Sequence, residues 1–74
     1  MAAPRPRTPV SFFTWLGAQD ERQDAVGAFA RLALRDRVCP KHSNRLHLFL
    51  LRYEHLPEHR SGIKAAHREW RAAR

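Results

Sequence analysis

Residues 24–36 read DAVGAFARLALRD, a stretch in which apolar side chains recur at helical spacing. Val26 and Phe29 fall on one face of such a helix. Asp24 belongs to the residue types that cap helix N-termini, and Pro40 lacks the N–H that a continuing helix would need. The stretch therefore predicts a helix that begins after Asp24 and ends near Asp36, since Pro40 prevents its continuation.

A shorter helix is predicted upstream. Ser11 is a second candidate N-cap, and Phe12, Trp15 and Leu16 follow it on one face. Because this segment is short and contains Gly17, we expect it to depend on tertiary packing more than on intrinsic helix propensity.

Two more helices are predicted downstream. Ser43 is a candidate cap for a third helix, Leu46–Tyr53, in which Leu48 and Leu51 make the helix apolar nearly all round. Such a helix is either the central one of a bundle or carries an exposed apolar patch. Pro57 suits the first position of a fourth helix.

The four segments predict an all-α fold, since strand-like alternation is missing from the sequence. We expect a single small four-helix bundle over residues 11–73, preceded by a flexible basic leader over residues 1–10 that contains three prolines. The predicted core consists of Phe12, Trp15, Leu16, Val26, Phe29, Ala30, Leu46, Phe49, Leu50, Tyr53, Ile63 and Trp70.

The composition limits the classes of protein. With 74 residues the chain has room for one domain, and its longest apolar run is far shorter than the 18 residues expected of a membrane span. The single cysteine leaves no internal disulfide and is typical of a reducing compartment. We expect a cytoplasmic monomer without a secretory signal.

The charge favours a polyanionic partner, nucleic acid first, because 14 Lys and Arg residues face 7 acidic ones and give a net charge of +7. A GC-rich genome is an alternative cause, because 12 of these 14 cations are arginines. A stripe on the predicted fourth helix has no acidic residue four positions away. The candidate nucleic-acid-binding residues are Arg60, Lys64, Arg68 and Arg71, extended by Arg37, Lys41 and Arg45.

Two other interpretations of the surface stay open. In the first, the stripe is a solvated outer face that binds nothing. Alternatively, the chain is a protein–protein adaptor that uses exposed apolar side chains. The candidate residues for that role are Leu48, Leu51, Leu34 and Phe13.

Cys39, His42, His55 and His59 reproduce the ligand spacing of a zinc finger. Pro57 interrupts the helical turn that should join the last two ligands, so we expect ordinary loop and surface side chains here, and no metal. A domain of this size has little interior left for a walled pocket, so neither an enzyme nor a cofactor is expected.

The sequence contains an ordered set of residues, Ser11-Phe12, Trp15-Leu16, Arg22-x-Asp24, Gly27-x-Phe29-Ala30, Asp36, Pro40-Lys41 and Trp70. With these spacings the set resembles the YozE-type family of small bacterial proteins. The resemblance implies a SAM-like helical bundle and leaves the function open. The sequence departs from the pattern at Cys39 and Ala66, where aromatic residues would be more usual.

Overall fold

The computed structural model describes residues 10–73, and this part of the chain is all-α. The predicted basic leader lies outside the described residues except for Val10. The helices are α1 (Phe12–Gly17), α2 (Ala25–Arg35), α3 (Leu46–Arg52), the short 3-10 helix η1 (Pro57–His59) and α4 (Arg60–Ala72).

Local capping explains where α1 and α2 begin. The Ser11 hydroxyl accepts a hydrogen bond from the Thr14 N–H at 3.1 Å. The Asp24 carboxylate accepts one from the Gly27 N–H at 3.0 Å. Each bond satisfies a donor that has no partner within its helix, which confirms both predicted N-caps.

The other two helix starts differ from the prediction. Ser43 does not cap α3: its hydroxyl accepts from the N–H of Arg45, and Arg45 itself occupies the N-cap without a side-chain cap. Pro57 begins the 3-10 turn η1, which leads directly into α4. Proline suits this place because the first turn of a helix leaves its N–H groups unpaired anyway.

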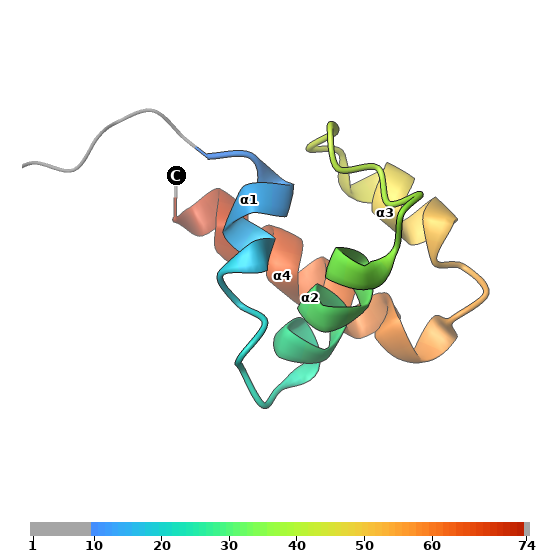
Figure 1. The fold of residues 1–74 in the computed structure, drawn as a ribbon, viewed down its shortest axis with the longest axis horizontal. Helices are drawn as coiled ribbons and strands as arrows, with labels where there is room; N and C mark the ends of the chain where they lie inside the picture. Colours follow the sequence, from blue (N-terminus) through green and yellow to red (C-terminus); the bar gives the residue numbers. More distant parts are fainter. Residues whose placement is uncertain (1–9, 74) are drawn as a thin grey trace, which may run out of the picture.

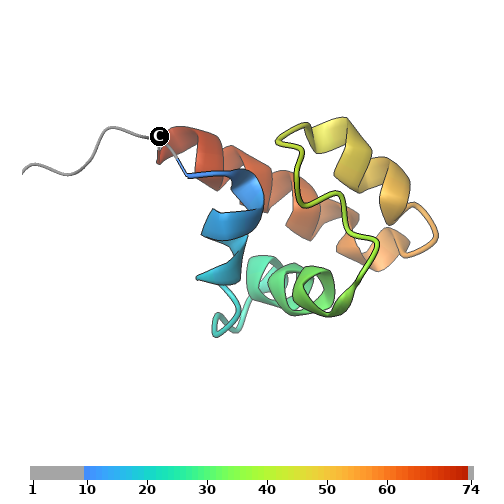
Figure 2. The same ribbon diagram turned by 45° about the horizontal axis from the view of Figure 1, so that its top comes forward.

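The central helix of the bundle is α4, which packs against α1, α2 and α3 (Figures 1 and 2). In both views α1 lies beside the C-terminal half of α4 and α3 beside its N-terminal half. The prediction that α3 might be central is therefore wrong. The seven-residue helix α3 is not covered on all sides, because Leu51 on its outer face is 58% exposed.

Close approach between α2 and α4 depends on Gly62. A Cβ atom added there would lie 2.6 Å from the carbonyl oxygen of Ala25, a distance that carbon atoms do not tolerate. Glycine therefore lets the backbones of α2 and α4 touch at this crossing.

Aromatic rings occupy the middle of the core. The Phe12 ring lies 4.9 Å from Phe49 and 5.6 Å from Trp70, both edge to face. Trp15, Leu46 and Leu50 are only half-buried and pack against the core rather than lying within it. The fully buried members are Phe12, Leu16, Val26, Phe29, Ala30, Ala33, Cys39, Phe49, Tyr53, Ile63, Ala66 and Trp70.

Cys39 corrects the expectation of a loop or surface side chain, because it is 5% exposed. The turn in which the Cys39 N–H donates to the Asp36 carbonyl folds this loop over the core. Its thiol lies near Tyr53, and burial raises the pKa of both groups.

Candidate nucleic-acid interface

Helix α4 has two unlike polar flanks on either side of its buried face. On one flank, Glu69 accepts a hydrogen bond from Arg22 at 2.8 Å. On the other, the Nε2 atom of His67 lies 2.8 Å from the carbonyl oxygen of Asn44. At 100° per residue, Arg60, Lys64 and Arg71 of the predicted basic stripe fall on the His67 flank, and Arg68 extends the stripe to the outer face, opposite the buried side.

All four cations of the stripe are exposed. Within residues 10–73, none of them forms an ion pair with an acidic side chain. The basic stripe is defined here as Arg60, Lys64, Arg68 and Arg71.

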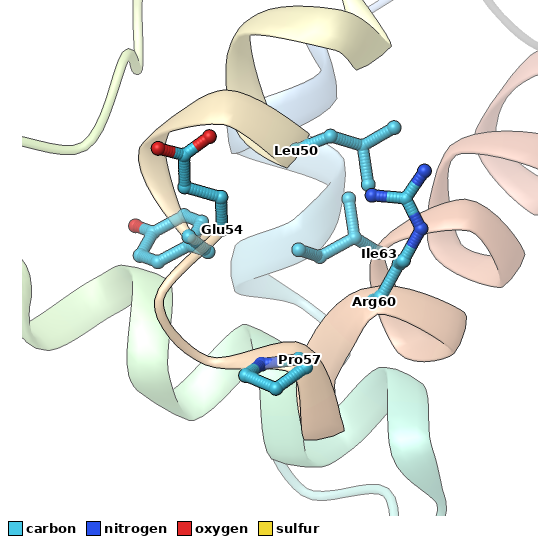
Figure 3. Close-up of a pocket in the computed structure, with 6 residues that line it drawn as sticks. Leu50, Glu54, Pro57, Arg60 and Ile63 are labelled. Atoms are coloured by element: carbon cyan, nitrogen blue, oxygen red, sulfur yellow. The ribbon is translucent and has the colours of Figure 1, made fainter.

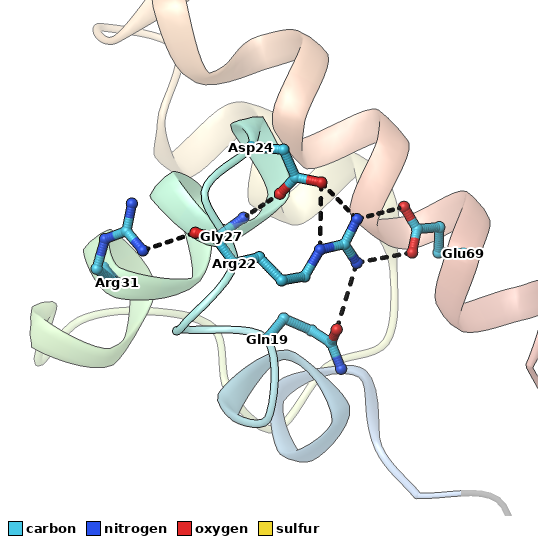
Figure 4. Close-up of polar contacts among 6 residues, drawn as sticks. All are labelled: Gln19, Arg22, Asp24, Gly27, Arg31 and Glu69. Atoms are coloured by element: carbon cyan, nitrogen blue, oxygen red, sulfur yellow. Dashed lines mark hydrogen bonds and ion pairs between the residues drawn. The ribbon is translucent and has the colours of Figure 1, made fainter.

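The acidic residues near the opposite flank are neutralised by Arg22 (Figure 4). Its guanidinium donates to both Glu69 oxygens, at 2.8 and 3.0 Å, and to Asp24 Oδ2 at 2.6 Å. These hydrogen bonds lower the pKa of both carboxyl groups and raise the pKa of Arg22. The guanidinium also reaches Gln19 Oε1 at 3.3 Å, so it joins the end of α1, the start of α2 and α4.

A second ion pair holds the C-terminal ends of α2 and α3 together. Arg52 donates to both oxygens of Asp36 at 2.8 and 2.9 Å, and Asp36 also accepts from the Val38 N–H. Hydrogen bonding to Arg52 is the largest cause that holds the pKa of Asp36 well below its usual range. Three of the seven acidic residues are thus engaged in internal ion pairs.

Asn44 connects the loop before α3 to α1 and to α4. Its side-chain oxygen accepts from the Phe12 N–H at 3.0 Å, and its carbonyl oxygen meets His67. Arg45, the next residue, therefore begins beside the flank of α4 that carries the basic stripe.

The position of the two remaining loop cations relative to α4 is not fixed by a hydrogen bond or an ion pair within residues 10–73. Lys41 and Arg37 are exposed, but no hydrogen bond or ion pair among the described residues ties either of them to α4. Arg37 follows directly on Asp36 at the other end of the loop. The structure thus places Arg45 directly after Asn44, whose carbonyl oxygen contacts His67 of α4, and leaves Lys41 and Arg37 on the connecting loop.

Sequence reasoning missed His67 and Asn44. A signal for His67 was present, because it lies at helical spacing with Ile63 and Trp70 on the inner face of α4. Asn44 has no comparable local signal, since its partners are 32 and 23 residues away in the sequence.

A small cavity lies at the N-terminal end of the stripe (Figure 3). Its volume is about 110 Å³, and Arg60 and Glu54 lie on opposite sides of it without forming an ion pair. A second cavity of about 270 Å³ is lined by Leu32, Arg35, Asp36, Arg52, Tyr53, His55 and Leu56. Both are smaller than the roughly 300–1,000 Å³ typical of small-molecule sites.

The zinc-finger spacing does not become a site. Within the described residues no group of three or more His, Cys, Asp and Glu side chains could hold a metal ion. Cys39 is buried while His42 and His55 are exposed, so these side chains do not converge. Burial, the largest cause, raises the pKa of the Cys39 thiol, which is the opposite of what a nucleophilic thiolate requires.

The candidate protein-interaction residues differ in exposure. Leu51 and Leu34 are exposed, at 58% and 43%. Leu48 and Phe13 are half-buried, and Phe13 packs against the core. The apolar surface is therefore smaller than the four candidates together would give, although Val38 adds another exposed side chain.

Among residues 10–73, no helix has the length and apolar character needed to cross a membrane. Comparison of the chain with protein-family models, with curated proteins and with solved structures finds no match.

Proposed function

We propose that this chain is a non-catalytic binding module that associates with nucleic acid through the basic stripe of α4. The observation that carries the proposal is the contrast between the two flanks of this helix. Glu69 on one flank is neutralised by Arg22, whereas the four cations of the basic stripe are exposed and unpaired within the described chain. Cations left without carboxylate partners are available for phosphate.

The arginine and lysine side chains of the basic stripe are both suited to phosphate contact. Arg60, Arg68 and Arg71 each carry a planar guanidinium, which can donate two parallel hydrogen bonds to one phosphate. Lys64 adds a compact positive charge. Each phosphate that is neutralised releases condensed counterions, so the affinity becomes strongly salt-dependent.

The salt dependence of binding tests the proposal. If the four stripe cations each neutralise one phosphate of duplex DNA, log affinity falls against log salt with a slope of about −3.6, from about −0.9 per phosphate. Fluorescence anisotropy with a labelled duplex measures this slope. Undetectable binding at about 50 mM salt, or an affinity indifferent to salt, contradicts the proposal.

A pair of variants with equal charge change locates the interface. Arg68→Gln removes a stripe cation, and we expect the slope to become less steep by about 0.9. Arg35→Gln is the matched control, because Arg35 is exposed, forms no described ion pair and lies at the end of α2. If both variants change the slope equally, binding depends on the net charge of the protein and not on the position of the stripe.

We also propose a bacterial, cytoplasmic setting and membership of the YozE-type family. The support for the family is that Phe12, Phe29 and Trp70 of the shared pattern all lie in the interior. The support for a reducing compartment is the single, buried Cys39 thiol.

A second candidate function is protein–protein association, which the exposure of Leu51 favours. A partner captured by the unaltered chain and lost with Leu51→Ser would support it. The same substitution leaves nucleic-acid affinity unchanged if the basic stripe acts alone.

A further inference from the structure

We infer that the nucleic acid recognised by the basic stripe is double-helical, and that single strands bind more weakly. This inference rests on the proposed function and adds the class of ligand. It follows from where the structure places the aromatic side chains and from the rigidity of the element that carries the cations.

Proteins that hold single strands combine cations with aromatic rings on which the bases stack. All seven Phe, Trp and Tyr side chains of this sequence lie among the described residues, and none of them is exposed. Phe13 and Trp15 are half-buried and pack against the core, and the other five are buried. A stacking platform beside the stripe is therefore missing.

Trp70 is the aromatic residue nearest to the stripe in sequence, directly before Arg71. Its ring is 4% exposed and lies edge to face against Phe12, and its indole N–H donates to the Val10 carbonyl oxygen at 2.9 Å. Because both the ring and its N–H are engaged inside the domain, Trp70 cannot turn outward to stack on a base without disrupting the core.

The stripe is a row of charges carried on a rigid backbone. Helix α4 is continuous from Arg60 to Ala72, and its buried face is held by all three other α-helices. The rise from residue 60 to residue 71 is about 16 Å, at about 1.5 Å per residue.

A double helix presents phosphates at fixed positions, one per about 3.4 Å of axis on each strand, so a row of this length spans about five base pairs. A flexible single strand would first have to be ordered against the row. Since no aromatic side chain stacks on its bases, that ordering is not compensated. The row of charges on a rigid backbone therefore favours the ligand whose phosphates are already ordered.

A comparison of duplex and single-stranded oligonucleotides of equal length tests the inference. We expect the full chain to bind a DNA duplex at least about tenfold more tightly at about 100 mM salt, with slopes of about −0.9 and −0.7 per phosphate for the two forms. An RNA duplex of the same length shows whether the preferred double helix is DNA or RNA. Tighter binding of either duplex than of the single strand supports the inference.

The two native tryptophans provide a second readout without any substitution. Because Trp70 is buried and Trp15 packs half-buried against the core, their fluorescence should stay unchanged when either oligonucleotide saturates the protein. Quenching by the single strand, or single-strand affinity equal to that for the duplex, overturns this inference and leaves the proposed function standing. Binding to neither form overturns both.

Discussion

At the scale of single residues, Arg22 shows how one side chain can connect segments that are far apart in the sequence. Its guanidinium bridges Asp24, two residues away, and Glu69, 47 residues away. The loop around it is held further by Arg31, which donates to the carbonyl oxygens of Asp20 and Arg22. The polar connection between α1 and α2 is thus an ordered part of the fold.

Asp36 gives a pH-dependent prediction at the same scale. Its pKa in the folded chain is lowered, chiefly by hydrogen bonding to Arg52. A lowered folded pKa stabilises the protein above the unfolded value of about 3.9, and this contribution is lost as the pH falls through the folded value. We expect Asp36→Asn to lower Tm at neutral pH, and the difference from the unaltered chain to shrink as the pH falls from about 5 toward 2.

Thermal unfolding followed by circular dichroism measures this difference at each pH. Asp20→Asn is the matched control, because the Asp20 carboxylate forms no described ion pair. A Tm difference for Asp36→Asn that stays constant across this pH range would show that the ionised Asp36 carboxylate does not stabilise the folded chain.

At the scale of elements, the crossing of α2 and α4 distinguishes two glycines that look alike in the sequence. Alanine is the better helix former by about 1 kcal/mol, so propensity alone predicts stabilisation at both Gly17 and Gly62. At Gly62 a Cβ atom would lie 2.6 Å from the Ala25 carbonyl oxygen, whereas at Gly17 the nearest atom is 3.7 Å away, on Leu34.

We therefore expect opposite signs. Gly62→Ala should lower the free energy of unfolding by about 1–3 kcal/mol, because two backbones would have to separate. Gly17→Ala should leave it unchanged or raise it by up to about 1 kcal/mol. Denaturant titration of both variants measures this, and a stabilised Gly62→Ala variant would contradict the close approach of α2 and α4.

At the scale of the whole molecule, the stability of the domain depends on one core built around α4. Phe12 is completely buried and contacts Phe49, His67 and Trp70, so it joins α1 to both α3 and α4. We expect Phe12→Ala to cost about 3–5 kcal/mol, out of about 5–15 kcal/mol for a typical domain.

Trp15→Ala provides the comparison. Its ring is half-buried and stacks on Phe12 at 6.2 Å, so we expect a smaller loss than for Phe12→Ala despite the larger side chain removed. Guanidinium titration of both variants orders the two losses. A larger loss for Trp15→Ala would contradict the placement of Phe12, and not Trp15, at the centre of the core.

The fold class, the caps at Ser11 and Asp24 and most of the buried apolar residues could be predicted from the residue order alone. These features depend on interactions between residues up to about four apart, which the order of residue types encodes directly. The four cations of the stripe were found in the same way, because helical spacing places them on one side of α4.

The central position of α4 and the pairing of charges became clear from the packing of the helices. Glu69 meets Arg22 across 47 positions, Asn44 meets His67 across 23, and Cys39 is buried because its loop folds over the core. These outcomes depend on how the helices pack, and local patterns of capping and periodicity do not encode the packing partner. The absence of ion pairs to the basic stripe among the described residues therefore follows from the arrangement of the helices and not from the count of arginines.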